Sequence, residues 1–279
     1  MNNPNEMKSS FSKSYMEKAE KKIRFTPLWF KIKLSRYIGK FRQYQRLLSR
    51  RQPPVLSAKP EITSNLEKAA AHYRTHGWAY IQNILSEEFL KEVIQNWPKK
   101  FYFDPPNTLA KSYDAGFHWG YGRPLDFKRF DPHNQNPIVT KFLNYLRSLE
   151  FSKRVTDFVG INKEFVCYSL TMNQACTGTQ VVPHKDGIQD DPRARADINI
   201  VFFVNGAGGK NSGNLSLFKD REGNEPIVEP DNLKNACLIY DTMADFYHGF
   251  KPVARGKFRW AIISEFTEKS FVEKYLEKA

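Results

Sequence analysis

EFVCYSLTMNQA at residues 164–175 and TQVVPHKD at residues 179–186 are the stretches that decide the fold of this chain. Both are rich in β-branched and aromatic residues, and the turn residues around them are typical of strand ends. Similar runs follow them: DINIVFFVN (197–205), NLSLF (214–218), EPIVEP (225–230), NACLIYD (235–241) and FRWAIISEF (258–266). About seven or eight short strands at this spacing predict a double-stranded β-helix, a jelly-roll core of cupin-like form.

The chain before this region shows helical patterns instead. SNLEKAAAHYRTHG (64–77) reads as one helix, and SEEFLKEVIQNWP (86–98) reads as a second, with Ser86 as its cap. A strand, WAYIQNIL, lies between these helices, and a further helix is expected at about residues 138–159. We therefore predict an α+β domain in which N-terminal helices pack on the outside of the β core.

Two potential metal ligands end the second of the opening runs. His184 and Asp186 are two residues apart, so on a strand both side chains project from the same face and can bind one ion. This pattern alone is weak evidence, because a solvated strand end produces it by chance. Iron sites that activate oxygen use two imidazoles and one carboxylate on one face of the metal, which leaves positions open for other ligands. His248, at the end of a later β-rich run, can supply the second imidazole.

A basic residue on the last strand points to a buried anion. Arg259 shares a strand face with Ala261 and Ile263, a pattern that leaves room beside an inward-pointing guanidinium. Arg255 is the competing basic residue, but it precedes Gly256 in an expected turn. We therefore select Arg259 as the anion-binding residue.

The motifs in residues 165–266 resemble those of a known family. HKD at 184–186, SGNLSLF at 212–218 and HGFKPVARGKFRWAIIS at 248–264 resemble the HxD, the GGxLxxF-type strand and the H-x-V-x-P-V…G…R segment of the prolyl 4-hydroxylase-like branch of the 2-oxoglutarate oxygenases. The helical lead-in HYRTHGWAYIQNILSEEFLKEV is similar to the start of that branch and of phytanoyl-CoA dioxygenase-like enzymes. Several ordered elements that agree together are more specific than any single motif.

The resemblance implies an Fe(II)- and 2-oxoglutarate-dependent dioxygenase, an oxidoreductase that uses O2 to hydroxylate an unactivated C–H bond. His184, Asp186 and His248 would be its catalytic metal ligands, and Arg259 would pair with the far carboxylate of 2-oxoglutarate. Halogenase relatives lack the carboxylate ligand, so the presence of Asp186 favours hydroxylation.

This sequence departs from the family pattern in two places. Arg259 lies eleven residues after His248, where many relatives place it at nine or ten. The strand after HxD carries Phe202 and neighbouring apolar residues where many relatives carry a tyrosine that binds 2-oxoglutarate. Asn199, or Asn173 on the strand before His184, is expected to provide the polar contact that this tyrosine would otherwise make.

Residues 101–137 are rich in glycine, proline and aromatic residues, which favours a long ordered loop. Aromatic faces stack on sugar rings and arginine binds anions, so part of this loop suits a sugar or another polar ring substrate. The alternative is a loop packed on its own aromatic side chains. The candidate substrate contacts are His118, Trp119, Tyr121 and Arg123.

Positive charge is concentrated at the N-terminus. Residues 1–60 hold 15 of the 43 Lys and Arg residues but 3 of the 30 Asp and Glu residues, a net charge of +12, whereas residues 61–279 carry +1. The amphipathic pattern of residues 28–48 predicts a basic helix. We interpret residues 1–60 as an extension and linker and 61–279 as the oxygenase domain. The helix could pack on that domain, lie on an anionic membrane or bind nucleic acid, and the near-neutral main domain argues against nucleic acid.

The sequence lacks an apolar run of the length that a spanning helix needs, and its three cysteines form no CxxC pair. These features favour a cytoplasmic protein, either free or peripheral on the inner face of a membrane. The leading hypothesis is a hydroxylase of a polar or anionic small molecule or glycolipid at a membrane surface, for example a lipopolysaccharide sugar such as 3-deoxy-manno-octulosonic acid. Alternatives are a protein hydroxylase of the prolyl type, a nucleic-acid demethylase and a non-catalytic metal- or sugar-binding barrel.

Overall fold

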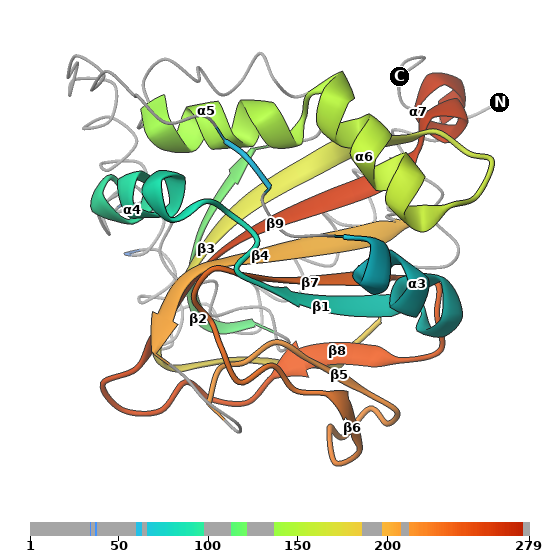
Figure 1. Ribbon diagram of the computed structural model, residues 1–279. Coiled ribbons are helices and arrows are strands. Elements are labelled where there is room, and N and C mark those ends of the chain that lie inside the picture. Colours follow the sequence, from blue (N-terminus) through green and yellow to red (C-terminus); the bar gives the residue numbers. More distant parts are fainter. Residues whose placement is uncertain are drawn as a thin grey trace, which may run out of the picture.

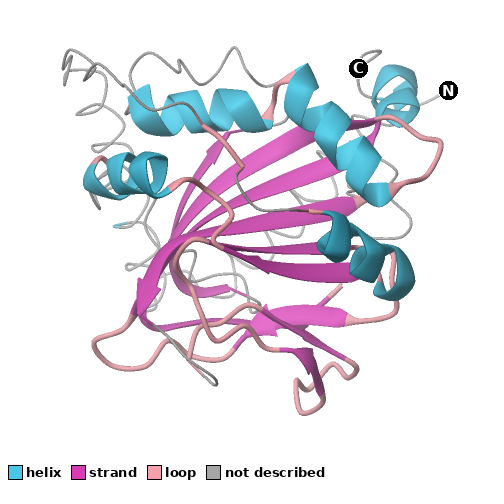
Figure 2. Ribbon diagram, in the orientation of Figure 1, coloured by secondary structure: helices cyan, strands magenta, loops and turns pink. Residues whose placement is uncertain are grey.

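The computed structural model describes residues 34, 37, 60–62, 66–97, 113–121, 137–185, 197–207 and 212–275. Antiparallel strands curl into a half-barrel, and helices cover its outer face (Figures 1 and 2). The helices are α3 (Glu67–His76), α4 (Glu87–Gln95), α5 (Pro137–Leu146), α6 (Leu149–Val159) and α7 (Lys269–Tyr275). The strands are β1 (Trp78–Gln82), β2 (Tyr113–Tyr121), β3 (Phe165–His184), β4 (Ile198–Ala207), β5 (Ser216–Phe218), β6 (Pro226–Val228), β7 (Ala236–Asp241), β8 (Tyr247–Phe250) and β9 (Phe258–Glu268).

The described strands follow the order β1-β7-β4-β9-β3-β8-β5-β6, and every pairing along this path is antiparallel. β3 joins the two halves of the barrel, because it pairs with β9 from Phe165 to Cys176 and with β8 from Val181 to His184. The two strands expected at residues 164–175 and 179–186 are therefore one long strand. This arrangement confirms the predicted jelly-roll core with helices packed outside it.

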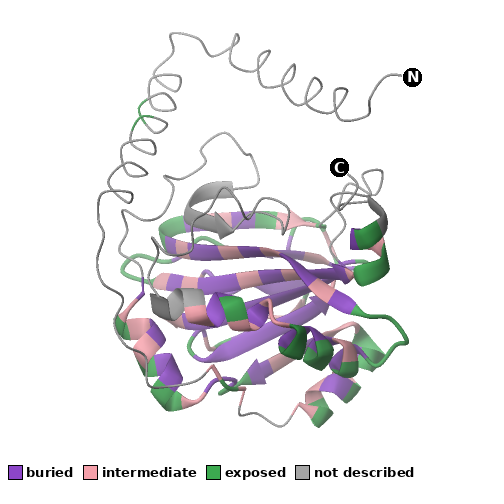
Figure 3. Ribbon diagram, turned by 90° about the horizontal axis from the view of Figure 1, so that it is seen from above, coloured by how far each residue is buried: buried purple, intermediate pink, exposed green. Residues whose placement is uncertain are grey.

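The central strands of the sheet are buried on both faces. On the outer face, Phe202 of β4 packs in a core with Phe142 of α5 and Phe151 of α6. On the inner face, Phe203 belongs to a second core that fills the barrel, together with Leu238. β4 is consequently apolar at consecutive positions, since each face of this strand contacts a core. Buried residues run along the central strands (Figure 3).

Helix caps explain where several helices begin and end. The Ser86 hydroxyl accepts a hydrogen bond from the Phe89 N–H, as expected for the cap of α4. The single helix expected at 138–159 is wrong: the region forms α5 and α6, because the Ser148 hydroxyl caps a new helix by accepting from the Phe151 N–H at 3.1 Å. Gly160 then ends α6 in the left-handed conformation.

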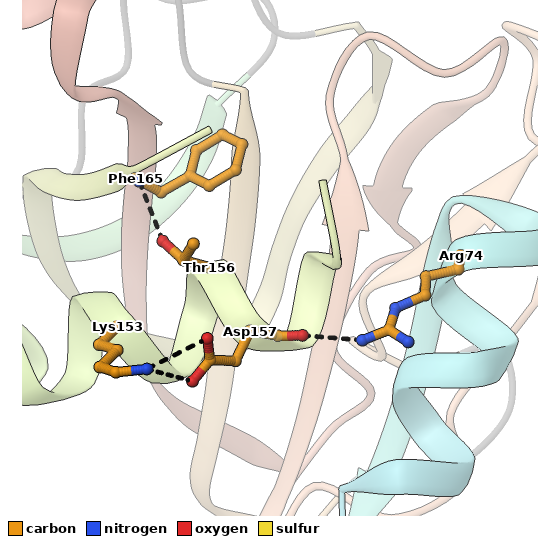
Figure 4. A network of polar contacts seen from close by, with 5 residues as sticks. All are labelled: Arg74, Lys153, Thr156, Asp157 and Phe165. Carbon is orange, nitrogen blue, oxygen red and sulfur yellow. Dashed lines mark hydrogen bonds and ion pairs between the residues drawn. The ribbon is translucent and has the colours of Figure 1, made fainter. Parts of the chain in front are cut away.

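Polar contacts tie α6 to its neighbours (Figure 4). Arg74 of α3 donates from Nη2 to the Asp157 carbonyl at 2.7 Å and from Nε to the Phe158 carbonyl at 3.2 Å, so it satisfies carbonyl groups in the last turn of α6. The Thr156 hydroxyl accepts from the Phe165 N–H at the start of β3. These contacts link α3, α6 and the long strand.

The expectation of an irregular loop over residues 101–137 was wrong in part. β2 occupies Tyr113–Tyr121 and pairs with the edge of β3 opposite β9, from Tyr113 next to Val181 to Tyr121 next to Leu170. Aromatic residues favour extended backbone, and the open edge of β3 provides hydrogen-bond partners for it.

The chain enters the domain at Ile62, which forms an isolated bridge with Leu85 and packs against the outer core. Of the helix expected at residues 28–48, the structure describes Leu34 and Tyr37, both helical and 60% and 69% exposed. The rest of that helix lies outside the described residues, and the boundary near residue 60 stays a prediction. Within the described part of the chain, no helix is long and apolar enough to cross a membrane.

Candidate active site

The two expected histidine ligands lie next to one another on paired strands. His184, the last residue of β3, lies opposite His248 in the β3–β8 register, and their ring centroids are 4.3 Å apart. His248 belongs to a strand of its own, β8, rather than to the end of the preceding run. His184 Nδ1 lies 2.9 Å from the Val182 carbonyl oxygen. With a proton on Nδ1, Nε2 would be the nitrogen that binds a metal, an arrangement typical of metal-binding histidines.

Asp186, the expected carboxylate ligand, lies outside the described residues, and its role stays a prediction. The structure does describe Lys185, the residue before Asp186. Lys185 Nζ lies 2.5 Å from Asp245 Oδ1 and 4.9 Å from the centroid of the Tyr247 ring. Tyr247 alternates with His248 along β8, so Lys185 lies on the side of the strand away from the histidine pair. This contact holds the chain next to Asp186 against the segment that leads into β8.

Arg259 is a buried cation within an apolar surrounding. The residue is 1% exposed, and its guanidinium lies 4.4 Å from the Phe250 ring centroid and 5.6 Å from the Phe203 ring centroid. Its Nε and Nη1 atoms have no hydrogen-bond partner among the residues that the structure describes. Burial lowers the pKa of Arg259 to about 10, so the guanidinium is still charged at neutral pH. A buried charge of this kind is costly unless an anion binds it.

Tyr240 connects the histidine pair to Arg259. Its ring centroid lies 5.1 Å from that of His248, and its hydroxyl accepts a hydrogen bond from Asn199 Nδ2 at 3.0 Å. Its proximity to Arg259 acts to raise the pKa of the guanidinium, against the larger effect of burial. Sequence reasoning missed Tyr240. The available signal was its alternation with Leu238, which places both side chains on the inner face of β7.

Both asparagines that were expected near 2-oxoglutarate are buried. Asn199 is 2% exposed and lies opposite Tyr240 in the β4–β7 register. Asn173 is 4% exposed and lies opposite Ala261, which belongs to the inner core and sits two residues from Arg259. The structure therefore brings both residues to the barrel wall that carries Arg259.

The expected substrate contacts are only partly located. The backbone of His118, Trp119 and Tyr121 lies in β2, with His118 opposite Asn173. Their side chains, and Arg123 as a whole, lie outside the described part of the chain. β2 thus borders the strand that carries Asn173 and His184, and the substrate roles stay predictions.

The donor set fits a mononuclear iron site. Two imidazoles face one another, and a carboxylate is expected two residues after His184. No group of three His, Cys, Asp or Glu side chains in metal-binding geometry occurs within the described ranges, which exclude Asp186. The buried guanidinium of Arg259 offers N–H donors at Nε and Nη1 that can bind an anion such as a carboxylate. The residues present are therefore compatible with both iron and 2-oxoglutarate.

Neither a protein-family model nor a curated protein sequence matches this chain. Solved structures do match it. A prolyl-4-hydroxylase from Pseudomonas putida aligns with 74% of this chain and 100% of its own, at 17% identity and a TM-score of 0.52. A Trichoplax adhaerens prolyl hydroxylase, in complex with a peptide fragment of the hypoxia inducible factor oxygen degradation domain, aligns with 75% of this chain and 92% of its own, at 16% identity and a TM-score of 0.54.

An oxidoreductase of the 2OG-Fe(II) oxygenase family from Burkholderia pseudomallei aligns with 76% of this chain and 96% of its own, at 13% identity and a TM-score of 0.52. At these identities the likeness concerns the fold. The chain has the fold of the 2-oxoglutarate and Fe(II)-dependent oxygenases, and the resemblance predicted from its motifs is confirmed at that level.

Proposed function

We propose that this protein is an Fe(II)- and 2-oxoglutarate-dependent dioxygenase that hydroxylates an unactivated C–H bond. The observation that carries the proposal is the Arg259 guanidinium, buried in the barrel with two N–H donors that have no partner among the described residues. A dicarboxylate such as 2-oxoglutarate can place one carboxylate on Arg259 and direct its keto acid end toward His184 and His248. Tyr240 is close to both His248 and Arg259.

Each residue has a distinct role in this reaction. His184 and His248, with Asp186, would hold the iron, which together with 2-oxoglutarate and O2 supplies the oxidation of the C–H bond. Arg259 would bind the far carboxylate through charge-assisted hydrogen bonds, which strengthen where water is excluded. Phe203 and Phe250 flank the guanidinium and exclude that water.

Uncoupled turnover tests this chemistry without a known substrate. The purified protein, supplied with Fe(II), 2-oxoglutarate and O2, should release succinate. His184→Ala should abolish succinate release, whereas His76→Ala, which removes an exposed histidine of α3, should not change it. A protein that binds metal and 2-oxoglutarate but releases no succinate would be the non-catalytic barrel instead.

For the substrate, we propose a polar or anionic small molecule or glycolipid that the protein meets at the cytoplasmic face of a membrane. The support is the basic amphipathic pattern of residues 28–48 together with the aromatic and glycine-rich sequence around residues 117–123. Leu34 and Tyr37 are three residues apart, share one helical face and are exposed. A lipopolysaccharide sugar such as 3-deoxy-manno-octulosonic acid is one compound of this class.

Deletion of residues 1–50 tests the membrane part of this proposal. The full-length protein should sediment with vesicles that contain anionic lipid, and the deletion should reduce this association while succinate release continues. Equal sedimentation of both proteins would rule out the membrane role.

A second candidate is a prolyl-type protein hydroxylase, which the two prolyl hydroxylases of similar fold favour. Mass spectrometry of proline-containing peptides incubated with the enzyme would then detect the gain of one oxygen atom.

A further inference from the structure

A second pair of histidines lies in α3, which leads directly into β1 (Figure 1). His72 and His76 are four residues apart, so their side chains project from the same face of the helix. Their ring centroids are 4.4 Å apart, close to the 4.3 Å between the rings of His184 and His248. Two histidines at this spacing on a helix can bind one metal ion between them.

The surroundings of His72 hold its ring in place and leave one of its nitrogens without a partner. Gly77 ends α3 in the left-handed conformation, and β1 begins at the next residue. The Trp78 ring then packs edge-on against the His72 ring, with centroids 4.4 Å apart. His72 Nε2 is buried and has no hydrogen-bond partner among the residues that the structure describes. A buried polar atom without a partner is costly, so a ligand that binds this imidazole would offset that cost.

The electrostatic surroundings of the pair suit a bound cation. His76 is the last residue of α3 and His72 lies one turn before it, at the end of the helix that carries the negative pole of the dipole. Arg74, in the same turn, donates to carbonyl groups at the end of α6, so its charge is directed away from the pair. Burial, and secondly His76, lowers the pKa of His72 and favours the neutral imidazole, which is the form that binds metals.

The donor atoms define the class of ion. Imidazole nitrogen suits Zn(II), Ni(II) and Cu(II), whereas Mg(II) and Ca(II) prefer oxygen ligands. Two imidazoles fill two coordination positions, so water would occupy the others. His76 is exposed, so its ring can turn to admit an ion from solvent.

We propose that His72 and His76 form a second metal site, which binds a divalent transition-metal ion of the zinc, nickel and copper class. The two imidazoles chelate the ion at the C-terminal end of α3, and Trp78 holds the His72 ring in position. This site is separate from the proposed iron site, whose histidines belong to β3 and β8.

Equilibrium dialysis of the full-length protein with Ni(II) tests this site. The comparison is made in proteins that carry His184→Ala, which removes a ligand of the proposed iron site. In that background, His76→Ala and His72→Leu should each weaken Ni(II) binding at least about tenfold. Mg(II) should not compete with Ni(II) for the site.

The fluorescence of Trp78 tests where the ion binds. In the same background, Cu(II) bound at the pair should quench the Trp78 emission, because the Trp78 ring contacts the His72 ring. The emission lost on adding Cu(II) should therefore be smaller in Trp78→Phe and in His76→Ala.

Thr75→Ala is the matched control. Thr75 is also exposed in the last turn of α3, but it is not a histidine, so the variant should bind Ni(II) as its parent protein does. Unaltered Ni(II) binding by His76→Ala, or unaltered Cu(II) quenching in Trp78→Phe, would overturn the proposal. Loss of the ion in His76→Ala but not in His72→Leu would also overturn it, because a single exposed imidazole would then be the ligand.

Discussion

Among single residues, Arg259 carries most of the functional argument. A guanidinium that is 1% exposed and flanked by Phe203 and Phe250 destabilises the ligand-free fold, since its hydration is lost without an ion pair among the described residues. A residue kept for stability would not be expected in this position. A binding role and a structural role for Arg259 therefore lead to opposite predictions. They differ in how an apolar replacement changes the stability of the ligand-free protein.

Arg259→Leu should abolish 2-oxoglutarate binding without lowering the stability of the ligand-free protein. The apolar side chain suits Phe203 and Phe250, and the cost of a buried charge disappears. In thermal unfolding, a hundredfold excess of 2-oxoglutarate over its Kd should stabilise the unaltered protein by about 2.7 kcal/mol and leave the variant unchanged. If the variant unfolded far below the unaltered protein without ligand, Arg259 would be a structural residue instead.

His72 should contribute to acid sensitivity. Burial, and secondly the neighbouring His76, lowers the pKa of His72 from its ordinary value of 6.5, and its Nε2 atom is buried without a partner in the described structure. The unfolded chain therefore binds more protons than the folded chain as the pH falls below 6.5. The stability that neutral His72 contributes to the folded protein is therefore fully present above pH 6.5. It is lost as the pH falls from 6.5 through the lowered pKa of the folded state.

In His72→Leu, the difference in unfolding free energy between about pH 7.5 and about pH 5 should be smaller than in the unaltered protein. Urea denaturation at both pH values measures this difference. Identical pH dependence in the two proteins would show that His72 is not protonated preferentially in the unfolded state.

Among the secondary-structure elements, the contact of β8 with β3 determines how His184 and His248 lie relative to one another. The strands lie close together at Gly249, where an added Cβ would lie 2.5 Å from the Val181 carbonyl oxygen and 2.9 Å from the Pro183 nitrogen. Gly249 follows His248 directly, so any displacement of β8 moves that imidazole away from His184.

Gly249→Ala should weaken metal binding at least tenfold, as measured by titration with Co(II), because β8 must shift away from β3. Gly178→Ala is the control. Gly178 also lies in β3 and has a φ of 83°, but an added Cβ meets nothing within 4 Å. The control should lose about 1 kcal/mol of stability through backbone strain and keep its metal affinity. Equal metal affinities in both variants would show that the β3–β8 spacing does not control the site.

In the molecule as a whole, two cores on opposite faces of one sheet support different tasks. The outer core joins the helices to the sheet, and the inner core surrounds Arg259 and Tyr240. The N-terminal entry is part of the outer core, since Ile62 and Leu66 pack against it and Ile62 bridges to Leu85. We therefore expect the folded domain to need the chain from about residue 60 onward.

Removal of residues 1–59 should leave the unfolding free energy unchanged, whereas removal of residues 1–66 should lower it by about 2 kcal/mol or more through loss of the Ile62 and Leu66 contacts. Chemical denaturation of both truncated proteins measures the difference. A large loss of stability on removing residues 1–59 would place the domain boundary earlier in the chain.

Local patterns in the sequence were sufficient to predict several elements. The strands at 197–205, 235–241 and 258–266 were predicted from β-branched and aromatic runs between turns, and Ser86 was recognised as a helix cap. These features depend on neighbouring residues and are visible in the order of amino acids. β2 and the division between α5 and α6 were missed, since β2 depends on the distant edge of β3 and Ser148 acts within a continuous apolar pattern.

The sequence by itself was sufficient to predict the jelly-roll class, and it selected His184 and His248 as candidate ligands and Arg259 over Arg255 as the candidate anion-binding residue. Ligand spacing and strand alternation are properties of the chain. Tertiary structure alone decided that the two imidazole rings lie 4.3 Å apart and that Arg259 is buried without a described hydrogen-bond partner at Nε and Nη1. It also decided that Tyr240 is close to both His248 and Arg259. These features depend on the pairing of strands that are distant in the sequence. A local sequence pattern does not show which strands pair, so it could not predict them.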